Sequence, residues 1–399
     1  MEEWKEYLLE DVGTITTGKT PKTAVKEYFG GTIPFVTPAD INTPYKYIAQ
    51  TDRYLTEEGL NSIINNSIEK GSICVSCIGN IGYTGIVQNK CASNQQINSI
   101  IVNKQYDRDF VYYAIKNLWP YFKSYEGQST TVSILNKGQF SKIPIKCPSL
   151  STQRKIASIL SSLDDKIEVN RKINENLEQQ AQALFKSWFV DFEPFKNGEF
   201  IESELGMIPK GWRVAKFGDF IKVSTEKAPV DSFPEYSVTN NGIIPRDKKF
   251  NKKLSMSSSK NKVLRKDNLV FGMSREILNW GVMEDEVGGV SSAYNVYILN
   301  KEIISPTYLK LYMKARISDF NSLIGTAARE GQSLDKGQLI QMQIYIPSES
   351  TLRGFFNVYY PLTDKIQAVE DESRRLAELR DTLLPKLMSG ELKVNEIEI

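Results

Sequence analysis

One segment of the sequence matches a nucleotide-binding loop. Residues 13–20 (GTITTGKT) fit G-x-x-x-x-G-K-[ST], in which backbone amides and a lysine hold the phosphates of a nucleotide. Such a loop follows a buried apolar strand and opens a helix. Here the mixed run 7–12 (YLLEDV) precedes the segment and Pro21 follows it. We therefore predict a turn, and a phosphate-loop nucleotide-binding enzyme remains an alternative.

A second glycine-rich segment, 79–85 (GNIGYTG), lies between the strand-like runs 72–78 and 86–87. Its spacing differs from the dinucleotide-binding fingerprint, and no amphipathic helix pattern follows it. We expect a glycine-rich hairpin, since such turns join neighbouring antiparallel strands. The hairpin could bring backbone and small polar groups close to a ligand.

Several kinds of catalytic site are excluded by residue types that the sequence lacks. It contains no histidine, which removes imidazole acid–base chemistry, Ser-His-Asp triads and His-based metal sites. Cys74 and Cys77 form C-x-x-C, but no second pair completes a zinc site. The sequence has no Pro-Pro, which a loop for methyl transfer to a base amine would need, and its two E-x-K triplets at the chain ends give weak support to a nuclease. We expect a protein with no catalytic residues, no cofactor and no metal of its own.

The positive charge is concentrated locally. The chain has 50 Lys and Arg against 48 Asp and Glu, a net charge of +2. Residues 246–266 (RDKKFNKKLSMSSSKNKVLRK) hold nine basic residues and one acid, Asp247, which gives this stretch +8. A polyphosphate is the partner that such a run attracts. In the first half, Lys19, Lys22, Lys26 and Lys46 lie among Thr, Tyr and Asn side chains that could contact phosphates or base edges.

The elements that carry these residues occur twice. The 399-residue chain aligns with itself at an offset of about 196 to 208 residues, with NSIIVNK (98–104) matching NVYILNK (295–301) and NKGQ (136–139) matching DKGQ (335–338). Each copy begins with about 150 residues of short strand-like runs and a few short helices, as at 110–117 and 308–314. A helical pattern of about 40 residues follows.

Both helical segments carry a heptad stripe, which favours a helix pair over a helix that packs only on its own domain. The stripes turn polar in the middle, at Asn170 and Asn174 and at Ser373 and Arg380. A polar layer of this kind fixes the register at a cost in stability. The predicted seam residues are Ile156, Leu160, Leu163, Ile167, Leu177, Leu184, Trp188, Phe355, Tyr359, Leu362, Ile366, Leu376, Leu383 and Leu387.

These patterns predict an α+β chain with six segments. They are a first β-rich domain (1–150), a central helix (151–190), a linker rich in Gly, Pro and acids (191–211), a second β-rich domain (212–349), a C-terminal helix (350–390) and a tail (391–399). The first residues lack an apolar run, and no stretch of about 18 apolar residues occurs. We expect a cytoplasmic protein that does not bind a membrane.

Over nearly its full length the chain resembles a DNA specificity subunit of a type I restriction-modification system. The resemblance is carried by GKTPKT (18–23), YFGGTIPFVTPADI (28–41), GNIGYTG (79–85), NQQIN (94–98), LFKSWFVDFEP (184–194) and GMIPKGW (206–212). It implies two β-rich target recognition domains, each reading half of a bipartite DNA sequence. They are separated by two long antiparallel coiled-coil helices with a pseudo-twofold internal repeat. The second unit lacks GGTIPFVTP, so two different half-sites are expected.

The resemblance also implies the partners. Double-stranded DNA, two modification subunits and the restriction subunits are expected, and S-adenosylmethionine is expected in the modification subunits, which methylate adenine. The residues that we expect to contact DNA are Lys19, Thr20, Lys22, Thr37, Asn80, Tyr83, Gln95, Arg246, Lys248, Lys249, Lys252, Lys253, Lys260, Arg275 and Trp280. Among them, Tyr83 is matched with Trp280 in the second copy. A scaffold that binds only proteins is the other alternative.

Overall fold

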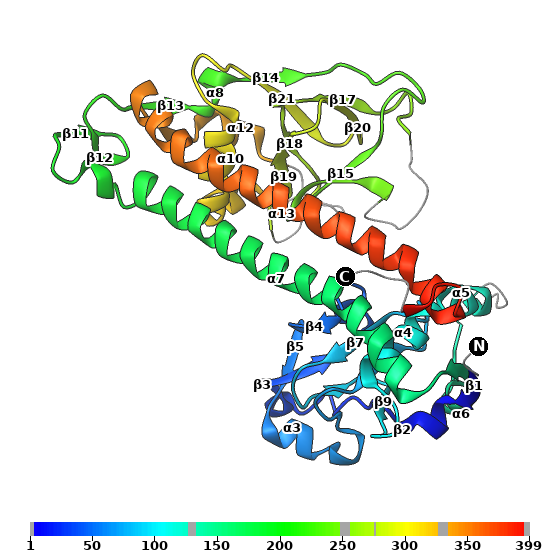
Figure 1. Ribbon diagram of the computed structural model, residues 1–399. Coiled ribbons are helices and arrows are strands. Elements are labelled where there is room, and N and C mark those ends of the chain that lie inside the picture. Colours follow the sequence, from blue (N-terminus) through cyan, green and yellow to red (C-terminus); the bar gives the residue numbers. More distant parts are fainter. Residues whose placement is uncertain (1–3, 127–132, 248–255, 275–276, 326–333, 395–399) are drawn as a thin grey trace. The chain divides into compact units, whose positions relative to one another are not determined.

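The computed structural model describes residues 4–126, 133–247, 256–274, 277–325 and 334–394 (Figure 1). The chain divides into two compact units. Unit 1 comprises Met1–Asn176 with Lys365–Ile399, and unit 2 comprises Leu177–Asp364. Two long helices, α7 (Leu150–Phe189, 40 residues) and α13 (Glu349–Ser389, 41 residues), run through this division, so each unit holds a part of both.

Unit 1 is built on a five-stranded sheet with the order β2-β9-β6-β7-β4, in which all pairs are antiparallel except β7 with β4. A second sheet has the order β5-β3-β8, and β1 pairs with β10. The strands are β1 (Lys5–Leu8), β2 (Gly13–Thr17), β3 (Phe29–Val36), β4 (Tyr47–Ile48), β5 (Arg53–Leu55), β6 (Ile73–Ser76), β7 (Thr84–Val87), β8 (Ala92–Ser93), β9 (Ile97–Val102) and β10 (Pro144–Cys147). The short helices are α1 (Leu9–Val12), η1 (Lys26–Tyr28), α2 (Pro38–Ile41), α3 (Glu57–Asn61), η2 (Ile64–Asn66), α4 (Arg108–Asn117), α5 (Trp119–Glu126) and α6 (Lys137–Ser141).

Unit 2 is built on a four-stranded sheet with the order β14-β21-β18-β19, and four further strand pairs accompany it. Its strands are β11 (Phe200–Ser203), β12 (Gly206–Pro209), β13 (Arg213–Lys216), β14 (Ile221–Ser224), β15 (Tyr236–Thr239), β16 (Gly242–Pro245), β17 (Lys262–Arg265), β18 (Leu269–Phe271), β19 (Trp280–Val282), β20 (Val287–Val290), β21 (Asn295–Leu299) and β22 (Gln343–Ile346). Its short helices are η3 (Glu193–Phe195), α8 (Phe217–Phe220), α10 (Pro306–Ala315), α11 (Ile317–Phe320), η4 (Asn321–Leu323) and α12 (Lys336–Gln341).

The strand ladders confirm the internal repeat. The pairs β1 with β10, β2 with β9, β6 with β9 and β6 with β7 recur as β13 with β22, β14 with β21, β18 with β21 and β18 with β19. The NKGQ and DKGQ matches mark helix starts: Asn136 accepts a hydrogen bond from the Gln139 amide at 2.9 Å, and Asp335 accepts one from the Gln338 amide at 2.9 Å. A side-chain oxygen before a helix satisfies amides that the helix itself leaves unpaired. The expected short helices at 110–117 and 308–314 are confirmed as α4 and α10.

The units differ where the sequence copies differ. The GGTIPFVTP segment forms β3 in unit 1, whereas unit 2 has the hairpin β15–β16 at the corresponding place in the chain order. The stretch 191–211, predicted as a linker, contains η3 and the hairpin β11–β12. Residues 13–17 of the nucleotide-loop match form strand β2, and the next helix after this strand is the short η1, which begins only at Lys26. The structure therefore argues against the phosphate-loop alternative.

The two long helices pack on each unit through buried side chains. Ile156, Leu160, Leu384 and Leu387 belong to the core of unit 1, and Phe185, Phe189 and Phe355 belong to the core of unit 2. All fourteen predicted seam side chains are buried or half-buried. Among the described residues, no helix is both long and apolar enough to cross a membrane.

Within unit 1 the two helices run antiparallel. Asp164 pairs with Arg380, the Asn170 amide donates to Ser373 Oγ at 3.2 Å, and the Asn174 amide donates to the Ile366 carbonyl at 3.3 Å. Residue numbers thus rise along α7 as they fall along α13. The predicted polar layer is present. Arg380 pairs with Asp164, a residue that the heptad pattern did not place in this layer.

Candidate nucleic-acid interface

In unit 1, five of the predicted DNA-contacting residues gather at one end of the five-stranded sheet. Because β2, β9 and β6 are successive antiparallel neighbours, the end of β2, the start of β9 and the end of β6 meet at the same end of the sheet. Lys19 and Thr20 follow β2, Gln95 precedes β9, and Asn80 and Tyr83 follow β6. The chain order of the strands thus brings together residues up to about 76 positions apart.

Hydrogen bonds hold these loops against one another. The Thr20 hydroxyl donates to Gln95 Oε1 at 3.0 Å, and the backbone amide of Cys77 donates to the Gln96 carbonyl at 2.7 Å. Lys19 and Gln95 are exposed, and Thr20 is half-buried. This end of the sheet therefore presents an ammonium group and an amide to solvent, which are the groups that contact phosphates and base edges.

The GNIGYTG segment is confirmed as the hairpin between β6 and β7. Gly79 and Gly82 have φ of 78° and 97°, in the left-handed region that favours glycine. The hydroxyl of Ser76 donates to the Asn80 carbonyl at 2.6 Å and accepts from the Tyr83 amide at 3.0 Å, which fixes the turn. Asn80 is left exposed at its tip.

Tyr83 lies in an aromatic hollow that the sequence did not indicate. Its ring packs against that of Trp119, with centroids 5.4 Å apart, and Lys123 Nζ lies 4.1 Å from the Trp119 centroid. Tyr83, Trp119 and Lys116 line a hollow of about 450 Å³. The spacing of Trp119 and Lys123 places both on one face of a helix, but only the fold brings that face to Tyr83.

The remaining predicted residues of unit 1 have different surroundings. Lys22 is exposed and follows Lys19 and Thr20 in the segment after β2. The Thr37 hydroxyl donates to Asp40 Oδ2 at 2.7 Å at the start of α2, so its hydroxyl hydrogen is used within the protein.

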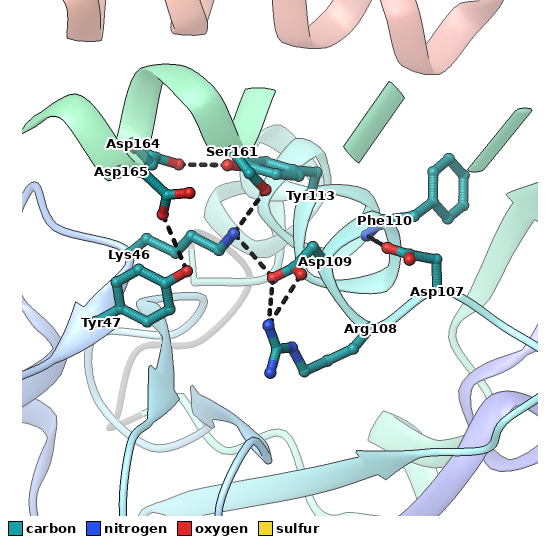
Figure 2. A network of polar contacts seen from close by, with 10 residues as sticks. All are labelled: Lys46, Tyr47, Asp107, Arg108, Asp109, Phe110, Tyr113, Ser161, Asp164 and Asp165. Atoms are coloured by element: carbon teal, nitrogen blue, oxygen red, sulfur yellow. Dashed lines mark hydrogen bonds and ion pairs between the residues drawn. The ribbon is translucent and has the colours of Figure 1, made fainter. Parts of the chain in front are cut away.

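Lys46, which the sequence places among side chains that could contact phosphates or base edges, is buried, and its side chain is 0 % exposed. Figure 2 shows its ammonium group between two elements: it lies 2.8 Å from Asp109 Oδ1 on α4 and donates to Ser161 Oγ on α7 at 2.7 Å. Burial raises the pKa of Asp109, but the charge of Lys46 outweighs it and leaves that pKa below its ordinary value. The Asp109 carboxyl group therefore stays ionised at neutral pH.

In unit 2, Trp280 lies at the equivalent end of the four-stranded sheet. It lines a hollow of about 570 Å³ with Lys314 and Ile317. Lys314 is the last residue but one of α10, as Lys116 is of α4, and Ile317 begins α11 as Trp119 begins α5. The two hollows therefore occupy corresponding places in the repeat.

The match of Trp280 with Tyr83 is wrong by one residue. Trp280 pairs with Phe271, which also pairs with Asn295. Asn295 corresponds to Asn98 in the sequence repeat. In unit 1, Asn98 pairs with Val75, and Val75 pairs with Thr84. Thr84 is thus the structural counterpart of Trp280, and a shift of one residue in a strand reverses the face on which a side chain lies.

The basic run is only partly described. Lys248, Lys249, Lys252, Lys253 and Arg275 lie outside the described residues. Three of the others form ion pairs with glutamates from elsewhere: Arg246 with Glu235 at 2.8 Å, Arg265 with Glu226 at 2.5 Å and Lys266 with Glu286 at 2.6 Å. Counting these three glutamates lowers the local excess from +8 to +5.

The two other described lysines of the run differ from each other. Lys260 is exposed. Lys262 donates to the Tyr294 carbonyl at 2.6 Å, just before β21 and hence close to the sheet end that carries Trp280. Burial lowers the pKa of Lys262.

Chemical groups for catalysis are few in the described part of the chain. There, no group of three or more Cys, Asp or Glu side chains is arranged to hold a metal ion. All four cysteines are free and buried, and burial raises the pKa values of the Cys77, Cys91 and Cys147 thiols to about 12, so these thiols are poor nucleophiles.

Each unit has a sheet end that carries polar and aromatic side chains, and comparison with known proteins gives the family of the chain. The family model for the type I restriction modification DNA specificity domain matches residues 1–179. The MjaIX specificity subunit of Methanocaldococcus jannaschii, a type I restriction enzyme subunit, is 31% identical over 99% of this chain and 95% of its own length. The HindI specificity subunit of Haemophilus influenzae is 35% identical over 43% of this chain and 39% of its own. The chain therefore belongs to the specificity subunits of type I restriction enzymes.

A solved structure shows the same fold. The S subunit of the type I restriction-modification system of M. genitalium superposes with a TM-score of 0.55 at 15% identity, covering 97% of this chain and 96% of that one.

Proposed function

We propose that the chain reads a bipartite DNA sequence, one half-site per unit. The observation that carries this proposal is the repeat of one sheet end in both units, with polar and aromatic side chains at each copy. At the first, Lys19 and Lys22 bind phosphates and fix the position, while Gln95 and Asn80 read base edges. The second copy holds Trp280 and the basic run instead, so it reads a different half-site.

The long helices set the spacing between the half-sites in this proposal. A helix of 40 residues is about 60 Å long at ~1.5 Å per residue. That length equals about 18 base pairs at ~3.4 Å each, which is an upper limit for the distance that the helices can span. Two readers about one turn of DNA apart lie on the same face of the duplex.

The same helices dock the modification subunits. Val169 and Ile173 on α7 are 50 % and 36 % exposed, and four residues apart they share one helix face. Leu379 on α13 is 47 % exposed. Exposed apolar side chains that lie together mark protein interaction sites.

This chain supplies recognition and no chemistry. The modification subunits bind S-adenosylmethionine and methylate adenine, the restriction subunits translocate and cut, and the complex acts in the cytoplasm. DNA binding distinguishes this proposal from a scaffold that binds only proteins. Phosphate contacts make DNA binding depend on salt, and such a scaffold would show no salt-dependent binding of this kind.

The test is methyl transfer from labelled S-adenosylmethionine to DNA. We expect no incorporation by the purified chain alone, and incorporation at one bipartite motif after the modification subunits are added. Modification subunits mixed with Lys19→Ala, Lys22→Ala protein serve as the matched comparison and should methylate more slowly. Methylation by the isolated chain, or a motif that is independent of this chain, would contradict the proposal.

A further inference from the structure

A buried polar network joins the first recognition domain to both long helices within unit 1. Lys46, just before β4, connects α4 and α7 through Asp109 and Ser161 (Figure 2). Its Nζ also lies 5.2 Å from the Tyr113 ring centroid and 5.3 Å from that of Tyr47. One ammonium group thus contacts a carboxylate, a hydroxyl and aromatic rings from three elements.

Asp164 on α7 is the second centre of the network. It accepts from the Tyr113 hydroxyl of α4 at 2.6 Å and from Arg380 Nη1 of α13 at 2.5 Å. The side chains of Asp164 and Arg380 are 1 % and 4 % exposed. At the edge of the network, the Tyr47 hydroxyl donates to Asp165 Oδ1 at 3.1 Å.

A network of this kind constrains orientation more than an apolar contact does. Hydrogen bonds need specific distances and angles, whereas apolar burial is non-directional and tolerates sliding. Apolar side chains of similar volume can give comparable stability, so buried ion pairs are better explained by the single arrangement that they allow.

Unit 2 lacks these groups at the corresponding positions. Thr307 and Leu311 of α10 stand where α4 has Asp109 and Tyr113, and Thr363 of α13 stands where α7 has Asp164. There the helices pack through aromatic rings, with Phe189 and Phe355 centroids 4.8 Å apart and Phe189 and Tyr308 centroids 5.1 Å apart.

We infer that Lys46, Asp109 and Asp164 are positioning residues that fix the orientation of the first recognition domain on the helix pair, and that this orientation restricts the spacer length that the protein accepts. The inference rests on the proposed function. It predicts that the network controls spacer selectivity while leaving the base sequence of the first half-site unchanged, since none of its side chains is among the residues that we expect to contact DNA.

The experiment uses the full chain assembled with its modification subunits. Methylation rates are measured on DNA with both half-sites separated by the native spacer and by spacers one or two base pairs longer or shorter. We expect Lys46→Met to lower the preference for the native spacer by about tenfold, a change of ~1.4 kcal/mol in discrimination. Lys90→Met removes an exposed lysine that pairs with the exposed Glu69, and it should leave the preference unchanged.

A milder variant covers the case in which Lys46→Met does not fold. Tyr113→Phe removes only the hydroxyl that donates to Asp164 and should broaden the spacer preference in the same direction. A folded variant that keeps the native preference, or loses rate equally on every spacer, overturns the inference. If the unaltered complex methylates no bipartite target, the proposed function itself fails.

Discussion

Lys116 is charged at an energetic cost beside the hollow that Tyr83 lines. Burial lowers the pKa of Lys116 to about 8, and the neighbouring Arg380 contributes to this decrease, against an ordinary value of 10.5. Between these two pH values the unfolded chain binds a proton that the folded chain does not. Stability contributed by this group therefore rises with pH across that window and is lowest below pH 8.

Replacing Lys116 tests this effect. Lys116→Met should raise the free energy of unfolding at pH 7 by roughly 2 kcal/mol and remove the increase in stability between pH 8 and 10. Urea unfolding at pH 7, 8.5 and 10 measures both. Lys314→Met, which changes the exposed lysine at the corresponding place in unit 2, should alter neither. A less stable Lys116→Met protein at pH 7 would contradict the argument.

The basic run is tested through the salt dependence of DNA binding. Changing Lys248, Lys249, Lys252 and Lys253 to Ala should weaken binding across sequences and reduce the slope of log K against log salt by about one for each phosphate that the variant no longer binds. Lys266→Ala is the matched control, because Glu286 already offsets that charge. An unchanged slope for the fourfold variant would show that these lysines do not contact DNA.

At the scale of elements, the repeat and the long helices could be predicted because both are patterns along the chain. The hairpin at 79–85 was predictable for the same reason. The position of Lys46 was not, because Asp109 and Ser161 lie 63 and 115 residues away and no local pattern connects them. The glutamates that offset part of the basic run lie outside it, 11 to 39 residues from their partners. The pairing of Trp280 depended on a strand register that sequence similarity alone did not resolve.

The helix pair is tested as a spacer by a matched insertion in both helices. Four residues inserted after Asn176 and four before Lys365 fall at the division between the units, so the contacts within each unit keep their register. The insertion adds about 6 Å and a rotation of roughly 40°. We expect the spacer in the methylated motif to grow by one or two base pairs, with both half-sites unchanged. An insertion in α7 alone should destabilise the protein, because the two helices would no longer keep a common register on both sides of the division.

An assembled and active insertion variant that retains the original spacer would show that another part of the complex sets the spacing.

At the scale of the whole molecule, the account holds that two recognition domains read two half-sites independently. The same ladder of strands in each unit supports this, and the different side chains at the two sheet ends explain why the half-sites should differ. The first recognition domain can be exchanged at the boundary between β10, which ends at Cys147, and α7, which begins at Leu150.

The most direct test is to map methylated sites in genomic DNA from cells that carry the modification subunits and either the unaltered chain or a chimera. In the chimera, residues 1–147 come from a relative that recognises a different target and retains Lys46, Asp109 and Tyr113. We predict two motifs that share one half-site and the spacer and differ only in the other half-site. A continuous motif, or a change in both half-sites, would contradict independent reading by two domains.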